Sequence, residues 1–205
     1  AIGSYPFPHI DTDGDGGGED AAERLIDRAR FGLYPPGSTF KLVTASAALR
    51  RDPSFSAATF TCALQPRGRV GARVGRWGVI RDDVLDRHAH GTIDMHDGLV
   101  HSCNAYFAQL AVQLGPQPIF ETANLLGISV ARDDSVNRLR ATLAHAGYGQ
   151  GDVVATPLRM ARVAAAIASN GILRDTAVQA RPIEPGRRFL TPQAAASHET
   201  ARWSA

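Results

Sequence analysis

The residue types and spacing at positions 38 and 41 suit nucleophilic chemistry. Ser38 and Lys41 are three positions apart, so on a helix they share a face with Cβ atoms about 5–6 Å apart. Lys41 is the sole lysine among 22 Lys and Arg residues, and a lysine, unlike an arginine, can be tuned to act as a base. Burial and the positive end of a helix both favour the neutral amine. The pair therefore predicts a serine nucleophile activated by a lysine.

A second pair of polar residues, Ser102 and Asn104, stands where the sequence predicts the start of a helix over 104–114. A serine hydroxyl there can pass a proton between lysine and leaving group, and an asparagine amide can hold both the amine and a substrate carbonyl. A structural alternative makes the serines helix caps, the lysine a solvated residue and the asparagine a buried amide. Two features oppose it, because a capping box would carry Glu or Gln at position 41 and a first-turn lysine opposes the helix dipole.

Two further polar clusters offer candidate metal sites. An acidic stretch matches the first half of a calcium-binding EF-hand loop, but Ala22 stands where a bidentate glutamate is needed. Its matching residues are Asp11, Asp13, Asp15 and Gly16. Four histidines alternate with aspartates in a spacing that fits no closed zinc signature. They are His88, His90, His96 and His101, among Asp82, Asp83, Asp86 and Asp94. We predict solvated or turn residues in both clusters, and no metal.

His101 also offers an alternative base for Ser38, which would make the protein a serine–histidine hydrolase. No Gly-x-Ser-x-Gly elbow supports that arrangement. The two cysteines, Cys62 and Cys103, are too few for a disulfide framework. We predict two free thiols in preference to a single disulfide bond between them.

The length and composition of the sequence are typical of a single globular domain. The chain has 205 residues, 44% hydrophobic and 20% charged, with a net charge of +2. This nearly balanced charge does not indicate a basic surface that binds nucleic acid. No apolar run approaches the roughly 18–20 residues of a membrane span, and no signal peptide is expected within the chain.

Turn and helix signals indicate a largely helical chain. Tyr34-Pro-Pro-Gly37 is a stiff breaker before a predicted nucleophile helix over 38–49, and 94–170 is predicted to be mainly helical. Helices are expected at Asn104 to Leu114, Ile119 to Leu126, Thr156 to Ser169 and from Thr191 towards Trp203. Segments 60–62 and 69–80 are expected to form short strands or loops. We predict a single, partial α+β domain over 1–205 with strands near its ends.

Several segments resemble the transpeptidase domain of penicillin-binding proteins, most closely the monofunctional class B proteins. Leu33-Tyr-Pro-Pro-Gly-Ser-Thr-Phe-Lys-Leu-Val-Thr44 resembles the family's Ser-x-x-Lys motif, and Ser102-Cys-Asn104 resembles its Ser-x-Asn motif. Gly147-Tyr-Gly-Gln-Gly151 and Thr156-Pro-Leu-Arg-Met-Ala161 are similar to the block before the third motif, and Ser4-Tyr-Pro-Phe-Pro8 to an early strand. The resemblance runs in the family's order over nearly the whole chain.

The resemblance implies the α+β fold shared by penicillin-binding proteins and serine β-lactamases, largely its helical part with an incomplete central sheet. It also implies a D,D-transpeptidase that cross-links peptidoglycan stem peptides. Ser38 would attack the D-Ala-D-Ala carbonyl with Lys41 as base, Ser102 would relay the proton, and Asn104 would position the substrate and the lysine. β-Lactams would acylate the same serine, and no cofactor would be required.

The family also suggests where such a domain works and with what. Its place would be the outer face of the bacterial cytoplasmic membrane or the periplasm, with the anchor outside this chain and a membrane glycosyltransferase as a candidate partner. The third family motif, Lys-Thr-Gly, is absent because Lys41 is the sole lysine. We therefore interpret the sequence as a fragment that is expected to be inactive alone.

Two other functions stay open at this point. A D,D-carboxypeptidase or β-lactamase would share Ser38 and Lys41 but pass the acyl group to water. A non-catalytic β-lactam-binding or scaffold module would tolerate the missing third motif.

Overall fold

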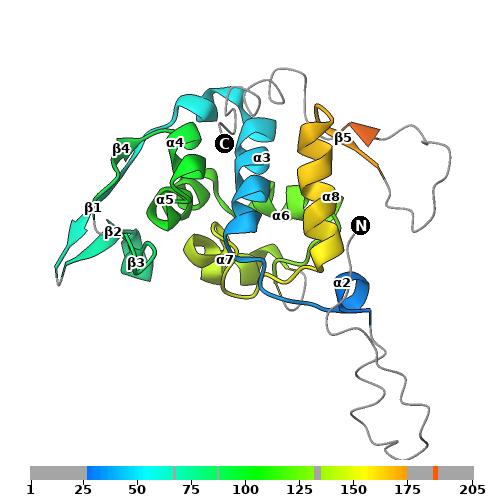
Figure 1. The fold of residues 1–205 in the computed structure, drawn as a ribbon, viewed down its shortest axis with the longest axis horizontal. Helices are drawn as coiled ribbons and strands as arrows, with labels where there is room; N and C mark the ends of the chain where they lie inside the picture. The colour runs from blue at the N-terminus through cyan, green and yellow to red at the C-terminus, as the bar shows by residue number, and fades with distance from the viewer. Residues whose placement is uncertain (1–26, 67, 87, 132–134, 175–186, 189–205) are drawn as a thin grey trace, which may run out of the picture.

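The computed structural model describes residues 27–66, 68–86, 88–131, 135–174 and 187–188, drawn in colour in Figure 1. Its α-helices are α2 (Arg28–Phe31), α3 (Lys41–Arg51), α4 (Met95–Val100), α5 (Asn104–Leu114), α6 (Pro116–Leu125), α7 (Val136–Ala146) and α8 (Pro157–Ala168). Its 3₁₀ helices are η1 (Gly37–Phe40), η2 (Pro53–Ala57) and η3 (Gly75–Trp77). Its strands are β1 (Phe60–Gln65), β2 (Arg69–Arg73), β3 (Val79–Arg81), β4 (Gly91–Ile93), β5 (Ile172–Leu173) and β6 (Arg187–Arg188).

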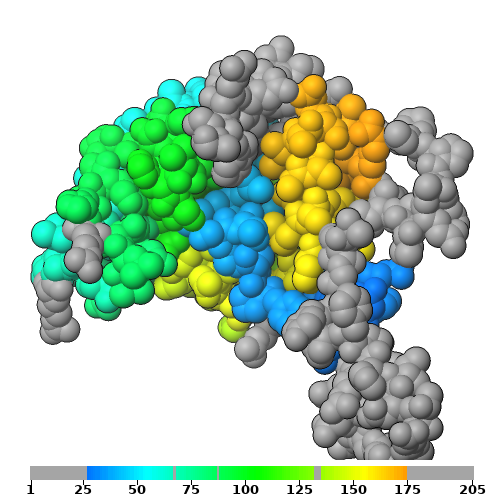
Figure 2. Space-filling view, in the orientation of Figure 1, coloured from blue at the N-terminus to red at the C-terminus, as the bar shows by residue number. Residues whose placement is uncertain are grey.

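Helix α3 forms the centre of the described core. All its residues from Val43 to Leu49 are buried, and most are small, so neighbouring helices can approach its backbone closely. It packs against α5, α6 and α8. In Figure 2 the blue segment containing α3 lies between the green residues and the yellow helix α8. This burial fixes the orientation of the first turn of α3, which carries Lys41.

A four-stranded antiparallel sheet, in the order β3-β2-β1-β4, lies beside the helices (Figure 1). Its register pairs Cys62 of β1 with Gly91 of β4, and Gly71 of β2 with Arg81 of β3. Helix α5 packs against β1, β2 and β3. The sheet therefore brings Cys62, the residues after β3 and the residues before β4 to the start of α5.

Helix α5 has the predicted bounds, Asn104–Leu114. It ends because Gly115 adopts φ 82°, a conformation that glycine accepts without strain. Helix α8 confirms the helix predicted from Thr156, whose side chain caps it by accepting from Arg159 N at 3.2 Å. Helix α6 starts at Pro116 rather than Ile119, since proline suits the first helical position.

Two features differ from the sequence-based expectations. Residues 37–51 form η1 followed by α3, not one α-helix that starts at Ser38. The larger described sheet spans Phe60 to Ile93 and includes the segments 60–62 and 69–80, where short strands or loops were expected, rather than lying near the chain ends. Helix α7 lies within the region 94–170 that is expected to be mainly helical, but its own bounds were not predicted.

Other expectations lie outside the described residues. These are the acidic loop at Asp11 to Gly16, the strand at Ser4 to Pro8 and the helix from Thr191. Among the helices that are described, none has the length and apolar character needed to cross a bilayer.

Candidate active site

The turn that carries Ser38 is held by backbone contacts from both sides. Tyr34 and Ala155 exchange two backbone hydrogen bonds. Tyr34 N donates to Ala155 O at 3.0 Å, and Ala155 N donates to Tyr34 O at 2.9 Å. Gly37 N donates to Gly149 O at 3.1 Å. Gly149 adopts φ 79°, and a Cβ there would lie 2.0 Å from the Gly37 carbonyl oxygen. The Gly147–Gly151 block therefore positions the Ser38 turn, a role that its sequence alone did not reveal.

Lys41 is the first residue of α3, and its side chain is buried with only 2% of the residue exposed. Its Nζ contacts Ser38 Oγ at 3.1 Å, Ser102 Oγ at 3.0 Å and Asn104 Oδ1 at 2.7 Å. It also donates to the Ser102 carbonyl oxygen. The structure thus brings together all four residues that the sequence singled out.

Burial lowers the pKa of Lys41 from 10.5 to about 8, because a charged amine loses its hydration inside the protein. The negative carboxylate of Asp82 acts in the opposite direction and raises this pKa. A substantial fraction of the amine is therefore neutral at mildly alkaline pH. Such an amine can accept a proton, which an exposed lysine at neutral pH cannot do.

Ser102 and Asn104 sit on the tight connection between α4 and α5. Ser102 has φ 50°, an unusual left-handed conformation for a residue with a side chain, costing about 1–2 kcal/mol. The flanking backbone fixes it, since Ser102 N donates to Leu99 O at 3.0 Å and Cys103 N to Gly98 O at 2.9 Å. Asn104 Nδ2 donates to Arg81 O at 3.2 Å, which turns its Oδ1 towards the lysine.

Asp82 supports this connection from behind, a role that the sequence did not indicate. Asp82 is only 5% exposed. Its Oδ1 accepts hydrogen bonds from Asn104 N and, at 3.1 Å, from Ala105 N. These N–H groups have no partner within α5, and they lie at the positive N-terminal end of the helix, where a carboxylate is stabilised. Its Oδ2 accepts from the thiols of Cys62 at 2.9 Å and Cys103 at 3.2 Å. Both cysteines are free thiols.

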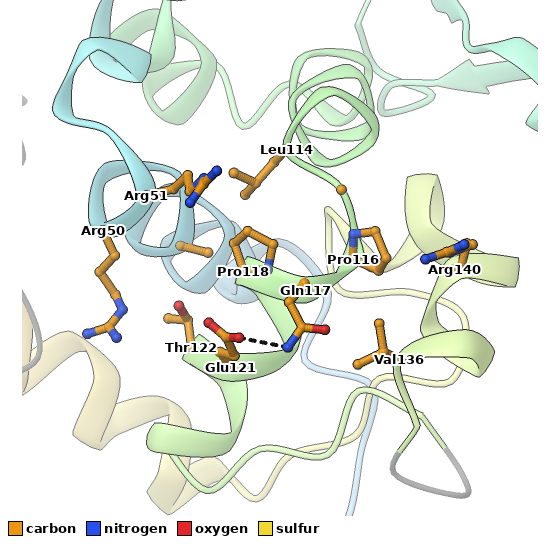
Figure 3. Close-up of a pocket in the computed structure, with 12 residues that line it drawn as sticks. Arg50, Arg51, Leu114, Pro116, Gln117, Pro118, Glu121, Thr122, Val136 and Arg140 are labelled. Atoms are coloured by element: carbon orange, nitrogen blue, oxygen red, sulfur yellow. Dashed lines mark hydrogen bonds between the residues drawn. The ribbon is translucent and has the colours of Figure 1, made fainter.

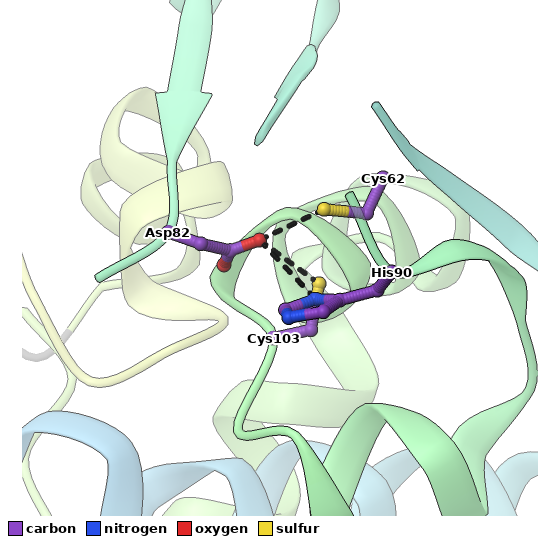
Figure 4. Close-up of side chains that lie close together, drawn as sticks. All are labelled: Cys62, Asp82, His90 and Cys103. Carbon is purple, nitrogen blue, oxygen red and sulfur yellow. Dashed lines mark hydrogen bonds and ion pairs between the residues drawn. The ribbon is translucent and has the colours of Figure 1, made fainter. Parts of the chain in front are cut away.

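The histidines of the sequence cluster separate in the structure. His88 is exposed, and His96 lies 3.1 Å from the neighbouring carboxylate of Asp97. His101 stacks on His90 with ring centroids 4.9 Å apart. Among the described residues, Ser38 Oγ bonds to Lys41 and not to His101. His90 instead faces Asp82, with Cys62 and Cys103 close by (Figure 4).

A separate pocket of about 560 Å³ lies at the other end of α3 (Figure 3). Its lining includes Arg50, Arg51 and Arg140, with Glu121 of α6, which accepts a 2.7 Å hydrogen bond from Gln117. An eleven-residue helix is about 16 Å long, so this pocket lies well away from Ser38. It takes no part in the arrangement around Lys41.

The family model of the penicillin binding protein transpeptidase domain matches residues 11–196. The chain belongs to this family. The transpeptidase domain is 29% identical over 165 residues to the peptidoglycan D,D-transpeptidase PbpA of Mycobacterium tuberculosis, covering 76% of this chain and 33% of that protein. It is 27% identical over 209 residues to the probable peptidoglycan D,D-transpeptidase FtsI of Caulobacter vibrioides, covering 95% of this chain and 33% of that protein.

Solved structures confirm the predicted α+β transpeptidase fold. Penicillin-binding protein A of M. tuberculosis, in its ceftriaxone acyl-enzyme complex, matches with a TM-score of 0.70 at 25% identity, covering 89% of this chain and 45% of the other. The transpeptidase domain of Burkholderia pseudomallei penicillin-binding protein 3 matches with a TM-score of 0.66 at 21% identity, covering 85% and 54%. The chain spans about a third of the length of these two curated relatives.

Proposed function

We propose that this transpeptidase domain is a serine acyl-transferase that cross-links peptidoglycan stem peptides and is acylated by β-lactams. The observation that carries the proposal is the contact of the buried Lys41 amine with four oxygen atoms, one of them Ser38 Oγ at 3.1 Å. M. tuberculosis PbpA, a relative, is named a peptidoglycan D,D-transpeptidase. The solved structure of M. tuberculosis penicillin-binding protein A, a structural neighbour, is an acyl-enzyme complex with the β-lactam ceftriaxone. The chemistry of the four contacts supports the same activity here.

Hydrogen-bond counting explains how Lys41 can serve as the base. A neutral amine has two N–H donors and one lone pair. Two of its neighbours, the Asn104 Oδ1 and the Ser102 carbonyl oxygen, can only accept, so they take the two N–H groups. The lone pair then faces the hydroxyls of Ser38 and Ser102, which can donate. The site therefore stabilises the neutral amine in the orientation needed to remove the Ser38 proton.

The acylation step follows from this geometry. Ser38 Oγ attacks the carbonyl carbon of the D-Ala-D-Ala bond while its proton passes to Lys41 Nζ. Ser102 Oγ, 3.0 Å from the amine, relays that proton to the leaving nitrogen as the peptide bond breaks. The terminal D-alanine departs and an ester on Ser38 remains. Attack by an acceptor amine then forms the cross-link and returns the proton to Ser38.

Asn104 holds both partners of the reaction. Its Oδ1 binds the lysine at 2.7 Å, and its Nδ2 is anchored at Arg81 O with a second N–H left to bind a substrate carbonyl. A β-lactam follows the same route, except that the leaving nitrogen stays attached through the opened ring. Stem peptides are cross-linked outside the cytoplasmic membrane, so we place the domain there, with a membrane glycosyltransferase as the source of the glycan strands.

Labelling with a fluorescent penicillin tests this function. In the full polypeptide containing residues 1–205, intact mass and peptide mapping should find one adduct, on Ser38. Ser38→Ala should abolish it, whereas Ser54→Ala, which removes an exposed serine from η2, should leave it unchanged. With a stem peptide and an acceptor amine, cross-linked dimer supports the transferase. Release of D-alanine without dimer would make the protein a carboxypeptidase, and no adduct on Ser38 would favour the scaffold module.

A further inference from the structure

Four side chains with metal-binding atoms meet behind the Ser-x-Asn segment (Figure 4). They are Cys62 of β1, Asp82 after β3, His90 before β4 and Cys103, the residue that caps α5. One ligand atom from each lies within 4.8 Å of all the others. They come from four separate segments, so the tertiary fold and not a local turn assembles the group.

The distances resemble those of a tetrahedral metal site. Asp82 Oδ2 lies 2.9 Å from Cys62 Sγ, 3.2 Å from Cys103 Sγ and 3.7 Å from His90 Nδ1. Around a tetrahedral zinc ion, bonds of about 2.0–2.3 Å place neighbouring ligand atoms about 3.3–3.8 Å apart. The three distances from Asp82 Oδ2 lie within about 0.6 Å of these values, so modest shifts of the side chains would accommodate an ion between them.

His90 gives an independent indication of a ligand. Its side chain is only 10% exposed, and its Nδ1 is buried without a hydrogen-bond partner among the described residues. A buried polar atom that lacks a partner is costly, and this one points towards the two thiols and the carboxylate. On the other side of the ring, Nε2 lies 3.8 Å from Asp86 Oδ2. A carboxylate behind the imidazole is the usual second contact of a metal-binding histidine.

We propose that Cys62, Asp82, His90 and Cys103 bind one thiophilic divalent cation of the zinc type. Two sulfurs, one imidazole nitrogen and one carboxylate oxygen are the donor set that tetrahedral zinc favours, whereas calcium and magnesium require oxygen ligands. On binding, both thiols release their protons. The ligands then carry three negative charges against the two positive charges of the ion, so the site keeps a net charge of about −1. This departs from the sequence-based expectation of no metal.

The ion would strengthen the support of the active site without touching substrate. Asp82 would bind it through Oδ2, which leaves Oδ1 free to keep its hydrogen bonds to Asn104 N and Ala105 N. Cys103 stands between Ser102 and Asn104, so a bond from its sulfur would fix the residues that contact Lys41. The four ligands are therefore positioning residues for the Ser-x-Asn segment.

Metal binding is tested on the purified chain after chelation and reloading with zinc or cobalt. We expect one zinc per chain, a cobalt form with thiolate-to-cobalt charge-transfer absorption, and protection of both thiols from a thiol reagent in the folded, loaded protein. His90→Ala should weaken zinc binding by a factor of at least about 100, since even outer contacts contribute 10- to 100-fold. His88→Ala is the matched control, because it removes an exposed histidine that belongs to neither group of metal-binding side chains in the described residues and should change zinc binding less than twofold.

Three results would overturn the site. They are the absence of the charge-transfer band in a folded cobalt-treated chain, equal zinc binding by the His90→Ala and His88→Ala variants, and a disulfide between Cys62 and Cys103 in the protein as isolated. Far-ultraviolet circular dichroism of each variant shows whether it is folded. The wild-type spectrum and thiol protection decide the question even if a variant does not fold.

The effect on acylation rests on the proposed function. Removing the ion from the full polypeptide should slow penicillin labelling of Ser38 at least about tenfold, with recovery on adding zinc, because small displacements of catalytic groups cost large factors in rate. Equal labelling with and without the ion would show that the metal does not position the segment. If neither form labels, the proposed function fails, while the zinc content, cobalt spectrum and thiol protection still decide the metal site.

Discussion

Lys41 Nζ lies 3.1 Å from Ser38 Oγ, although the two residues belong to different types of helix. Ser38 lies in the 3₁₀ helix η1 and Lys41 opens the α-helix α3. The tighter 3₁₀ turn brings side chains three positions apart nearly into line, which shortens the reach between hydroxyl and amine. The packing of α3 then prevents the amine from turning away to water.

Replacement of Lys41 by arginine separates its charge from its ability to act as a base. Lys41→Arg should slow acylation of Ser38 by about 10²–10⁴, nearly as much as Lys41→Ala, because a guanidinium stays protonated. Stopped-flow labelling with a fluorescent penicillin measures the rates, and urea unfolding shows whether both variants fold. An arginine variant within a few-fold of the wild-type rate would mean that Lys41 supplies only positive charge.

Asn104→Asp should raise the pKa of Lys41, because a carboxylate would replace an amide oxygen 2.7 Å from the amine. Less neutral amine would then be present at pH 7, and acylation there should fall at least about tenfold and recover partly as the pH rises above 9. Asn104→Ala, which removes the contact without adding charge, should slow the reaction without this alkaline shift. Identical pH profiles for the two variants would contradict the electrostatic explanation.

The contact between Gly37 and Gly149 predicts a difference in stability. Both glycines have positive φ, but only at Gly149 would a Cβ collide with backbone, 2.0 Å from Gly37 O. Gly37→Ala should therefore lower the free energy of unfolding by about 1–2 kcal/mol through backbone strain alone. Gly149→Ala should lower it further and also displace the Ser38 turn. Urea unfolding measures both, and equal losses would show that the collision is relieved without cost.

The sequence predicted those parts of the site that carry a local signal. Ser38 and Lys41 are close in the chain, and Ser102 and Asn104 flank a predicted helix start, so residue type and spacing were informative. Asp82 and Gly149 carry no such signal. Their roles depend on contacts formed across the fold, from Asp82 to Asn104, 22 residues later, and from Gly149 to Gly37.

The same limit applies to the fold. Helices α5 and α8 have strong caps and stop signals, and their positions followed from sequence. The bounds of the larger sheet depend on pairing between strands as short as three residues, such as β3 and β4. His90 and Cys62 illustrate the consequence, because only the sheet register brings them to the start of α5.

Titration of Lys41 tests most directly the claim that Ser38 is activated by a neutral lysine. Because Lys41 is the sole lysine, a chain grown with ¹³C-labelled lysine gives one side-chain ε-carbon signal by nuclear magnetic resonance. In the folded chain its midpoint should lie near pH 8, and in urea it should return to about 10.5. A folded-state midpoint at or above pH 10 would leave the amine protonated at neutral pH and would contradict its role as the base.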